Sequence, residues 1–165
     1  FVLASFNGIY SSRTDSRVED DLKIIKGAKD NFPFSALLKS MENKINKAEI
    51  DEGDFKNIDV NILRGNIGKK YLFMLYILLH KNNATDWAGK PLSERKFNEL
   101  AKHHIFSREE LSDKGYDEIM RNHLGNLTFI DQNVNGELHD RLPNDYLNDF
   151  DEQTLERHFI PLVIT

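Results

Sequence analysis

The sequence contains no cysteine, which excludes a disulfide framework, a zinc site built on thiolates and a cysteine nucleophile. Long apolar runs are also missing: the longest, residues 71–79, has nine residues, whereas a membrane-spanning helix needs about 20. The sequence does not begin with the charged and apolar pattern of a secretory leader. We therefore expect a cytoplasmic protein with no membrane partner, in which any metal is bound by His, Asp, Glu or Asn.

An excess of basic residues is absent as well. The 165 residues include 22 Lys and Arg against 27 Asp and Glu, a net charge of −5, which argues against a nucleic-acid binder that relies on overall charge. Residues 1–93 carry +2 (14 basic, 12 acidic), residues 94–141 carry −3 (7 and 10) and residues 142–165 carry −4 (1 and 5). Any contact with a polyanion must therefore be local. The first residue, Phe1, and the apolar end lead us to expect a piece of a longer protein.

The length allows about one ordinary domain, or a core with a small appended unit. The first part has the pattern of helices: Ser16 and Glu19 form a capping box ahead of an apolar stripe that ends near Gly27. A second stripe follows Ser35. A third helix is expected at about residues 67–81, and because it is apolar nearly all round it should lie in the centre of the packing.

A loop rich in Asn, Gly and Pro at residues 82–91 is the best candidate for a boundary between two regions. We expect a helical subdomain at residues 1–93 and a second region at residues 94–165. In the second region, the apolar spacing at residues 97–105 fits both a helix and the end of a strand.

Stronger local signals follow. Ser107 and Glu110 form another capping box, so a short helix should begin at about Arg108. Residues 124–130 are rich in β-forming side chains and predict a strand, and Asp131 is a candidate cap for a short helix that follows. The predicted fold class is therefore mainly α with a small β element.

Six histidines are candidates for chemistry. Taken singly, His80, His123 and His158 are expected to be structural or exposed. The adjacent pair His103 and His104 is different, because a kink of the chain after the pair would aim both rings into one site. On a regular strand the two rings would point to opposite faces.

The segment Gly125–Asn135 (GNLTFIDQNVN) gives this pair a context. Together with His103-His104-Ile105-Phe106, it resembles the HNH nucleases of the ββα-metal class, and more closely the C-terminal nuclease domains of the GmrSD-type restriction and phage-defence proteins. The segments at residues 140–147 and 158–161 resemble the tail of that group. The resemblance covers residues 97–161 and is only loose before residue 94. It implies a fold in which a helical subdomain is followed by a ββα-metal (HNH) nuclease motif.

The resemblance implies roles for four residues. His104 would be the general base that takes a proton from water, a task suited to an imidazole with a pKa of about 6.5. His103 and Asn135 would bind a divalent cation, and Asn126 would tie the histidine loop to the second strand and orient the His104 ring. An Asn that only satisfies loop backbone is the alternative for Asn126.

Three further residues are weaker candidates. His139 lies four residues after Asn135, so a regular helix would place both on one face and let them share a metal. An exposed histidine is the alternative that we favour there. Arg141 and Arg108 are candidates for binding the phosphates that flank the scissile one, with solvated surface charge as the alternative for both.

The sequence departs from the family pattern at two positions. Ser107 stands where relatives usually have proline, and His103 stands where many HNH enzymes have aspartate. Because a neutral ligand lowers the negative charge of the site, Mg²⁺ is the expected cofactor but Mn²⁺, Ni²⁺ and Zn²⁺ remain open.

The leading hypothesis is a metal-dependent DNA endonuclease in a restriction or phage-defence protein. The resemblance also implies that target selection and nucleotide-dependent control reside in an N-terminal part of the same polypeptide. One alternative is a non-catalytic DNA-binding or protein-interaction module that keeps the HNH scaffold. Another is a small helical regulator with incidental histidines, which would contain no strand pair.

Overall fold

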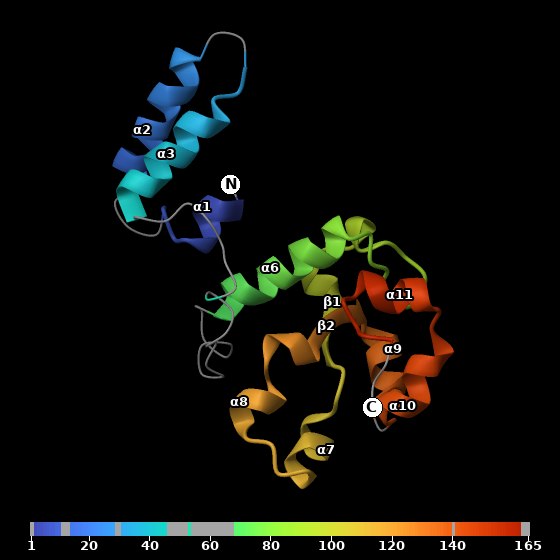
Figure 1. Cartoon of the computed structure of the whole chain (residues 1–165). Helices are drawn as coiled ribbons and strands as arrows, with labels where there is room; N and C mark the ends of the chain where they lie inside the picture. Colours follow the sequence, from blue (N-terminus) through green and yellow to red (C-terminus); the bar gives the residue numbers. More distant parts are fainter. Residues whose placement is uncertain are drawn as a thin grey trace. The chain divides into compact units, whose positions relative to one another are not determined.

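The computed structural model describes residues 2–10, 14–28, 31–45, 53, 68–139 and 141–162 (Figure 1). These residues are mainly helical and contain one two-stranded antiparallel sheet, as the sequence predicted. The sheet contradicts the interpretation of the chain as a purely helical regulator. Among the helices in these ranges, none is both long and apolar enough to cross a bilayer.

The chain divides into two compact units, residues 1–56 and 57–165. The sequence led us to expect the division after residue 93. The helix at residues 68–81 therefore belongs to the same unit as the candidate site, and not to the helical subdomain that we expected to precede it.

The described part of the first unit contains helices α1 (Val2–Phe6), α2 (Thr14–Gly27) and α3 (Phe34–Ile45). Because α2 begins at Thr14, Ser16 lies inside the first turn, and the prediction that Ser16 caps this helix was wrong. Helix α2 does end at Gly27, as expected.

A buried carboxylate joins the helices of the first unit. Asp21 is 6% exposed and accepts hydrogen bonds from the hydroxyl of Tyr10 (2.7 Å) and the hydroxyl of Ser40 (3.0 Å), and it forms an ion pair with Lys44 (2.8 Å). Because these three partners come from the α1–α2 connection and from α3, the pairing fixes how the helices of this unit pack.

The described part of the second unit begins with a long helix and continues through short elements around the sheet. In chain order these are α6 (Gly68–Lys81), η1 (Leu92–Glu94), η2 (Phe97–Glu99), β1 (Leu100–His104), α7 (Arg108–Asp113), α8 (Glu118–Arg121), η3 (Leu124–Asn126), β2 (Leu127–Asp131), α9 (Gln132–Glu137), α10 (Pro143–Tyr146), η4 (Leu147–Asp149) and α11 (Glu152–Arg157).

The spacing at residues 97–105 resolves into a short η2 turn followed by strand β1. Strand β1 pairs antiparallel with β2, with Leu100 opposite Asp131 and His104 opposite Leu127. The predicted strand at residues 124–130 begins only at Leu127, because residues 124–126 form the η3 turn. The predicted cap is confirmed at Ser107, whose hydroxyl accepts a hydrogen bond from the Glu110 N–H.

The two faces of the sheet are covered by different elements (Figure 1). On one face, Phe129 of β2 contacts Tyr76 of α6 at 6.2 Å between ring centroids. On the other face, Ile130 is buried in a cluster with Leu138, Leu155 and other apolar side chains of the C-terminal segments. Both faces therefore rely on elements outside the strands.

Helix α6 has a buried side and an exposed side, which differs from the central position that we expected. Met74, Leu75 and Leu79 are buried, whereas Phe73 is 37% and Leu78 is 41% exposed. Its aromatic residues pack within the unit: Tyr76 contacts Phe97 and Phe129, and its hydroxyl donates a hydrogen bond to Arg95 O (2.8 Å).

His158 is a structural histidine, as expected, and it links three distant segments. It is 3% exposed, its Nε2 lies 2.7 Å from Thr85 O, and its Nδ1 lies 2.6 Å from the hydroxyl of Thr128. Because the carbonyl only accepts, Nε2 donates to it and Nδ1 accepts from Thr128. Burial lowers the pKa of His158 to about 4, so the ring is neutral at neutral pH.

Acid should therefore destabilise the fold in a defined pH range. The pKa of His158 is near 6.5 in the unfolded state and about 4 in the folded state. Between pH 6.5 and pH 4 the unfolded state therefore binds more protons, and the free energy of unfolding should fall as the pH is lowered through this range. The contribution of His158 should be roughly 3 kcal/mol. Urea denaturation from pH 7 to pH 4.5 measures it. His158→Gln should show a shallower pH dependence, and His80→Gln, at an exposed position, should match wild type; equal slopes in all three proteins would contradict this account.

Candidate functional site

The loop after β1 is tied to the segment before β2 by Asn126. Its Oδ1 accepts a hydrogen bond from Phe106 N–H (2.8 Å), and its Nδ2 donates to Phe106 O (3.0 Å) and to Arg121 O (2.9 Å). Asn126 is 8% exposed, so these bonds satisfy a buried amide. The side chain therefore joins the histidine loop to the segment before β2, and because its three bonds all go to backbone, the arrangement fits both the expected tie and the alternative of an Asn that only satisfies loop backbone.

A cavity of about 610 Å³ opens at the end of β1. Six of the seven candidate residues line it, and Asn126 lies outside its lining. The six are His103, His104, Asn135, His139, Arg141 and Arg108. We call this space the histidine cavity.

The chain bends at Ile105 and Phe106, directly after the histidine pair, where the sequence led us to expect a kink. Strand β1 runs through both His103 and His104, so the two side chains leave it toward opposite faces. The cavity lies at the end of the sheet, where both rings can still line it.

His103 contacts Asn135 directly. Its Nδ1 lies 2.9 Å from Asn135 Oδ1, although 32 residues separate them, because α9 folds back against the sheet. On the other side of the ring, Nε2 lies 3.1 Å from the hydroxyl of Tyr146. His103 is 6% exposed, and burial lowers its pKa, so the ring is neutral at neutral pH.

The chemistry of this pair fits a divalent cation. A neutral imidazole nitrogen and an amide oxygen are both metal ligands. Neighbouring ligands around an octahedral cation, each about 2.0–2.1 Å from it, lie about 3 Å apart. The observed separation of 2.9 Å between His103 Nδ1 and Asn135 Oδ1 matches this spacing, and it equally matches a direct hydrogen bond between the two groups.

Few other side chains among the described residues are placed to bind the same cation as His103 and Asn135. In the part of the chain that the structure describes, no group of three His, Cys, Asp or Glu side chains is placed to hold one ion. His139 lines the cavity but lies beyond the end of α9, which stops at Glu137, so the regular helix that would align it with Asn135 does not extend that far. A cation on His103 and Asn135 would therefore be completed by water or by oxygens of a substrate.

His104 is oriented by Asn122, a residue that the sequence analysis missed. Its Nε2 lies 3.2 Å from Asn122 Oδ1, and Asn122 Nδ2 donates to Glu118 O (3.1 Å). Because that bond fixes which amide atom faces the ring, Nε2 must carry the proton and Nδ1 is left as an acceptor. Asn126, which we expected to orient this ring, is instead occupied by the backbone of Phe106 and Arg121.

The electrostatic environment keeps His104 uncharged. Burial, with smaller contributions from Lys102 and Arg108, lowers the pKa of His104 to about 4. At neutral pH the ring is therefore in the form that can accept a proton.

The two candidate phosphate ligands differ. Arg141 forms an ion pair with Asp149 (2.7 Å) and donates to Asp145 O (3.0 Å), so part of its binding capacity is already used. Arg108 is exposed at the first position of α7. Acidic side chains also line the cavity, namely Glu109, Glu110 and Asp113.

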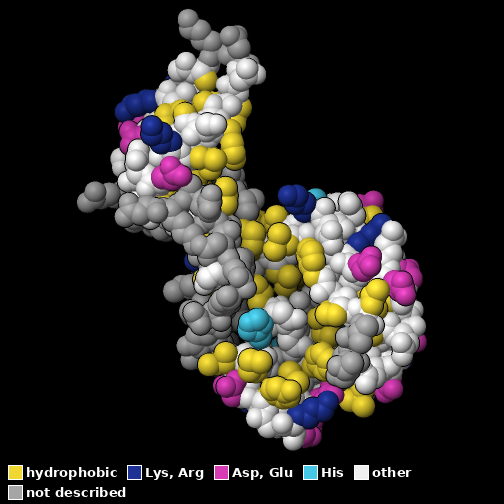
Figure 2. Space-filling view, in the orientation of Figure 1, with side chains coloured by type: hydrophobic (Ala, Val, Ile, Leu, Met, Phe, Trp, Pro, Cys, Tyr) yellow, Lys and Arg dark blue, Asp and Glu magenta, His cyan; other side chains and the backbone are white. Residues whose placement is uncertain are grey.

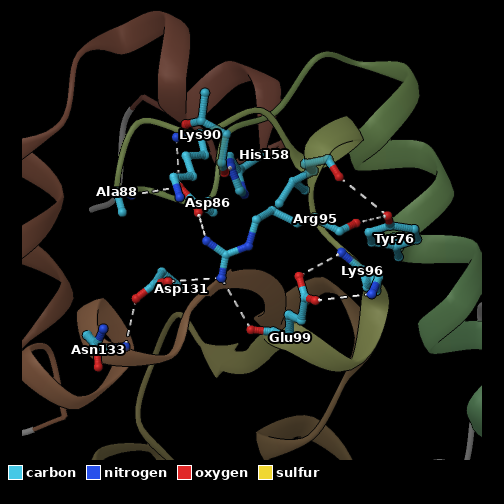
Figure 3. A network of polar contacts seen from close by, with 12 residues as sticks. Tyr76, Asp86, Ala88, Lys90, Arg95, Lys96, Glu99, Asp131, Asn133 and His158 are labelled. Atoms are coloured by element: carbon cyan, nitrogen blue, oxygen red, sulfur yellow. Dashed lines mark hydrogen bonds and ion pairs between the residues drawn. The ribbon is translucent and has the colours of Figure 1, made fainter.

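A buried ionic network holds the start of α9, the helix that carries Asn135 (Figure 3). Arg95 joins two carboxylates: its Nη1 lies 2.6 Å from Asp86 Oδ2, and its Nη2 lies 3.0 Å from Asp131 Oδ2. Asp131 Oδ1 accepts from Asn133 N–H (2.8 Å) and so caps α9, as the sequence predicted. The hydrogen bonds from Asn133 and Arg95 keep the pKa of Asp131 below its usual value.

Comparisons with known proteins do not assign this arrangement to a family. No family model matches the chain, and neither does any curated protein or solved structure.

Breaking the ionic network should be costly, because Asp86 is 0% exposed. Arg95→Gln leaves this carboxylate buried without its cation, and we expect the free energy of unfolding to fall by about 3–5 kcal/mol. Lys114→Gln, which removes the exposed partner of Glu110, should lower the free energy of unfolding far less, because an exposed ion pair is screened by water.

Urea denaturation of both variants measures these losses. The double variant Asp86→Asn with Arg95→Gln should recover part of the loss, because it removes the unpaired charge. Similar small losses for Arg95→Gln and Lys114→Gln would show that the network does not hold this region.

Proposed function

We propose that the second unit is a metal-dependent DNA endonuclease with an HNH-type ββα-metal site. The observation that carries the proposal is the 2.9 Å contact between His103 Nδ1 and Asn135 Oδ1 in the cavity that His104 also lines. The two ligands come from β1 and α9, and the strand, strand and helix order agrees with the family that the sequence resembles.

His104 is the proposed general base. Its Nδ1 accepts a proton from a water molecule, the water oxygen attacks the phosphorus, and the bond from phosphorus to the 3′ oxygen breaks. The proton stays on His104 as an imidazolium, and the 3′ oxygen takes a proton from solvent, which gives 5′-phosphate and 3′-hydroxyl ends. A bound phosphate beside His104 favours the charged ring and raises its pKa from about 4 toward the operating pH.

His103 and Asn135 would hold the divalent cation, with Mg²⁺ the first choice. When bound, such an ion neutralises negative charge that develops on the leaving oxygen. Asn122 keeps the His104 ring in the tautomer that presents Nδ1, and Asn126 keeps the loop after β1 in place.

DNA binding would depend on local contacts. The visible face of the molecule carries basic and acidic side chains in small separate groups (Figure 2). Of the two candidate arginines, Arg108 is the better placed to take a phosphate beside the scissile one, because Arg141 is paired with Asp149. An N-terminal part of the same polypeptide would supply the remaining affinity, target selection and nucleotide-dependent control.

Replacing the base tests the catalytic proposal. The wild-type chain should nick supercoiled DNA in the presence of Mg²⁺ or Mn²⁺, and His104→Ala should lower the rate by about 10²–10⁴-fold. The matched control is His80→Ala, which removes an exposed histidine on α6 outside the histidine cavity. Equal rates in His104→Ala and wild type would exclude His104 as the base.

One observation favours a second candidate function. The acidic side chains in the cavity lining and the pairing of Arg141 leave little net positive charge for a polyanion. The second candidate is therefore a non-catalytic DNA-binding or protein-interaction module that retains the scaffold.

Divalent cations distinguish the two candidates. If the chain binds a cation through His103 and Asn135, saturation at 100 times the dissociation constant should add about 2.7 kcal/mol to the free energy of unfolding. Thermal denaturation with and without Mg²⁺ or Mn²⁺ measures the gain, which should disappear in Asn135→Ala. A non-catalytic scaffold should show no gain in either protein.

A further inference from the structure

Tyr146, the last residue of α10, holds the far side of the His103 ring. Its side chain is 1% exposed, and its hydroxyl lies 2.6 Å from Ile105 O and 3.1 Å from His103 Nε2. The ring of Tyr146 also packs edge-on against the imidazole at 5.7 Å between centroids. The histidine is therefore bracketed by Tyr146 on one side and Asn135 on the other.

The direction of these hydrogen bonds follows from counting protons. Ile105 O can only accept, so an oxygen–oxygen distance of 2.6 Å requires the single hydroxyl proton of Tyr146. The phenol oxygen must then accept toward His103, and Nε2 must carry the proton that it accepts. In a neutral ring, Nδ1 is therefore bare.

The bare nitrogen faces Asn135 Oδ1 at 2.9 Å. Two acceptors at this distance need a positive group between them, either a cation or, with the amide turned by 180°, an N–H of Asn135 itself. In either arrangement His103 keeps Nδ1 free of a proton.

We propose that Tyr146 is the positioning residue that selects the metal-binding tautomer of His103. This inference rests on the proposed function of the His103 and Asn135 pair. By accepting the Nε2 proton, the phenol oxygen keeps Nδ1 available as a ligand for a divalent cation. The segment after α9 is thereby part of the site, although Tyr146 lies 43 residues from His103 in the sequence.

Removing the phenol oxygen should reverse the tautomer. In Tyr146→Phe, Nε2 loses its acceptor, and a proton on Nδ1 gains Asn135 Oδ1 as its acceptor. That proton competes with the cation for the same nitrogen. Loss of the outer hydrogen-bond partner of a metal-binding histidine typically weakens metal affinity roughly 10- to 100-fold.

The chain offers a matched control. Tyr76 has a phenol hydroxyl that donates to Arg95 O (2.8 Å), in the same unit but without contact to His103. Tyr76→Phe therefore removes an equivalent phenol oxygen and leaves the Arg95 carbonyl without this donor, just as Tyr146→Phe leaves the Ile105 carbonyl without its donor. Only Tyr146→Phe alters the histidine.

The first measurement uses Mn²⁺ alone as the probe, with the full chain and no DNA. Titration followed by electron paramagnetic resonance should show affinity roughly 10- to 100-fold weaker in Tyr146→Phe and unchanged in Tyr76→Phe. Mn²⁺ binding that is equally tight in Tyr146→Phe and wild type would overturn the role of Tyr146 alone. Absence of Mn²⁺ binding by the wild-type chain would overturn the proposed metal site itself.

The second measurement reads the tautomer in the metal-free protein. Nitrogen-15 spectra of the histidine side chains should show His103 protonated at Nε2 in wild type and in Tyr76→Phe, and at Nδ1 in Tyr146→Phe. A wild-type His103 protonated at Nδ1 would overturn the proposal whether or not the variants fold.

Discussion

A sheet of two five-residue strands cannot hold its shape in water by its own hydrogen bonds, so β1 and β2 depend on what covers their faces. Helix α6 covers one face through the contact between Tyr76 and Phe129. The C-terminal segments cover the other face around Ile130 and through His158. If either cover were lost, the pairing that sets His103 opposite Thr128 would lose its support. The geometry of the cavity is therefore a product of packing around the sheet more than of the strands themselves.

Local structure was the part that the sequence predicted well. A capping side chain and the backbone N–H group that donates to it lie within four residues of each other. Ser107 and Asp131 could therefore be recognised as helix caps from the sequence alone. The same kind of signal failed at Ser16, because α2 begins two residues earlier. Strand β1 could not be distinguished from a helix by spacing, since its identity depends on pairing with β2, whose residues lie more than twenty positions away.

The residues of the candidate site were likewise predicted from the sequence only in part. A sequence pattern brought attention to His103, His104 and Asn135, and their roles remain predictions. No pattern indicated Asn122, and Tyr146 stood out only as part of the segment at residues 140–147, without a role; the two residues contact the rings across separations of 18 and 43 residues. Their side chains are ordinary polar and aromatic residues whose function arises only from long-range packing. A loop signal at residues 82–91 suggested a boundary, but the contacts of α6 with the sheet place this helix in the second unit.

Strand β2 passes into α9 without a linker, since Asp131 ends the strand and Gln132 begins the helix. One residue inserted at this junction would rotate every later side chain by about 100° around the helix axis and turn Asn135 away from His103. The stretch from Ile105 to Asn126 is fixed at its two ends, which bond to each other, and at Asn122, which bonds to His104. A change in chain length at residues 114–117, between α7 and α8, adds or removes no residue that lines the cavity or bonds to His104, whereas a change at the strand-to-helix junction moves Asn135 itself.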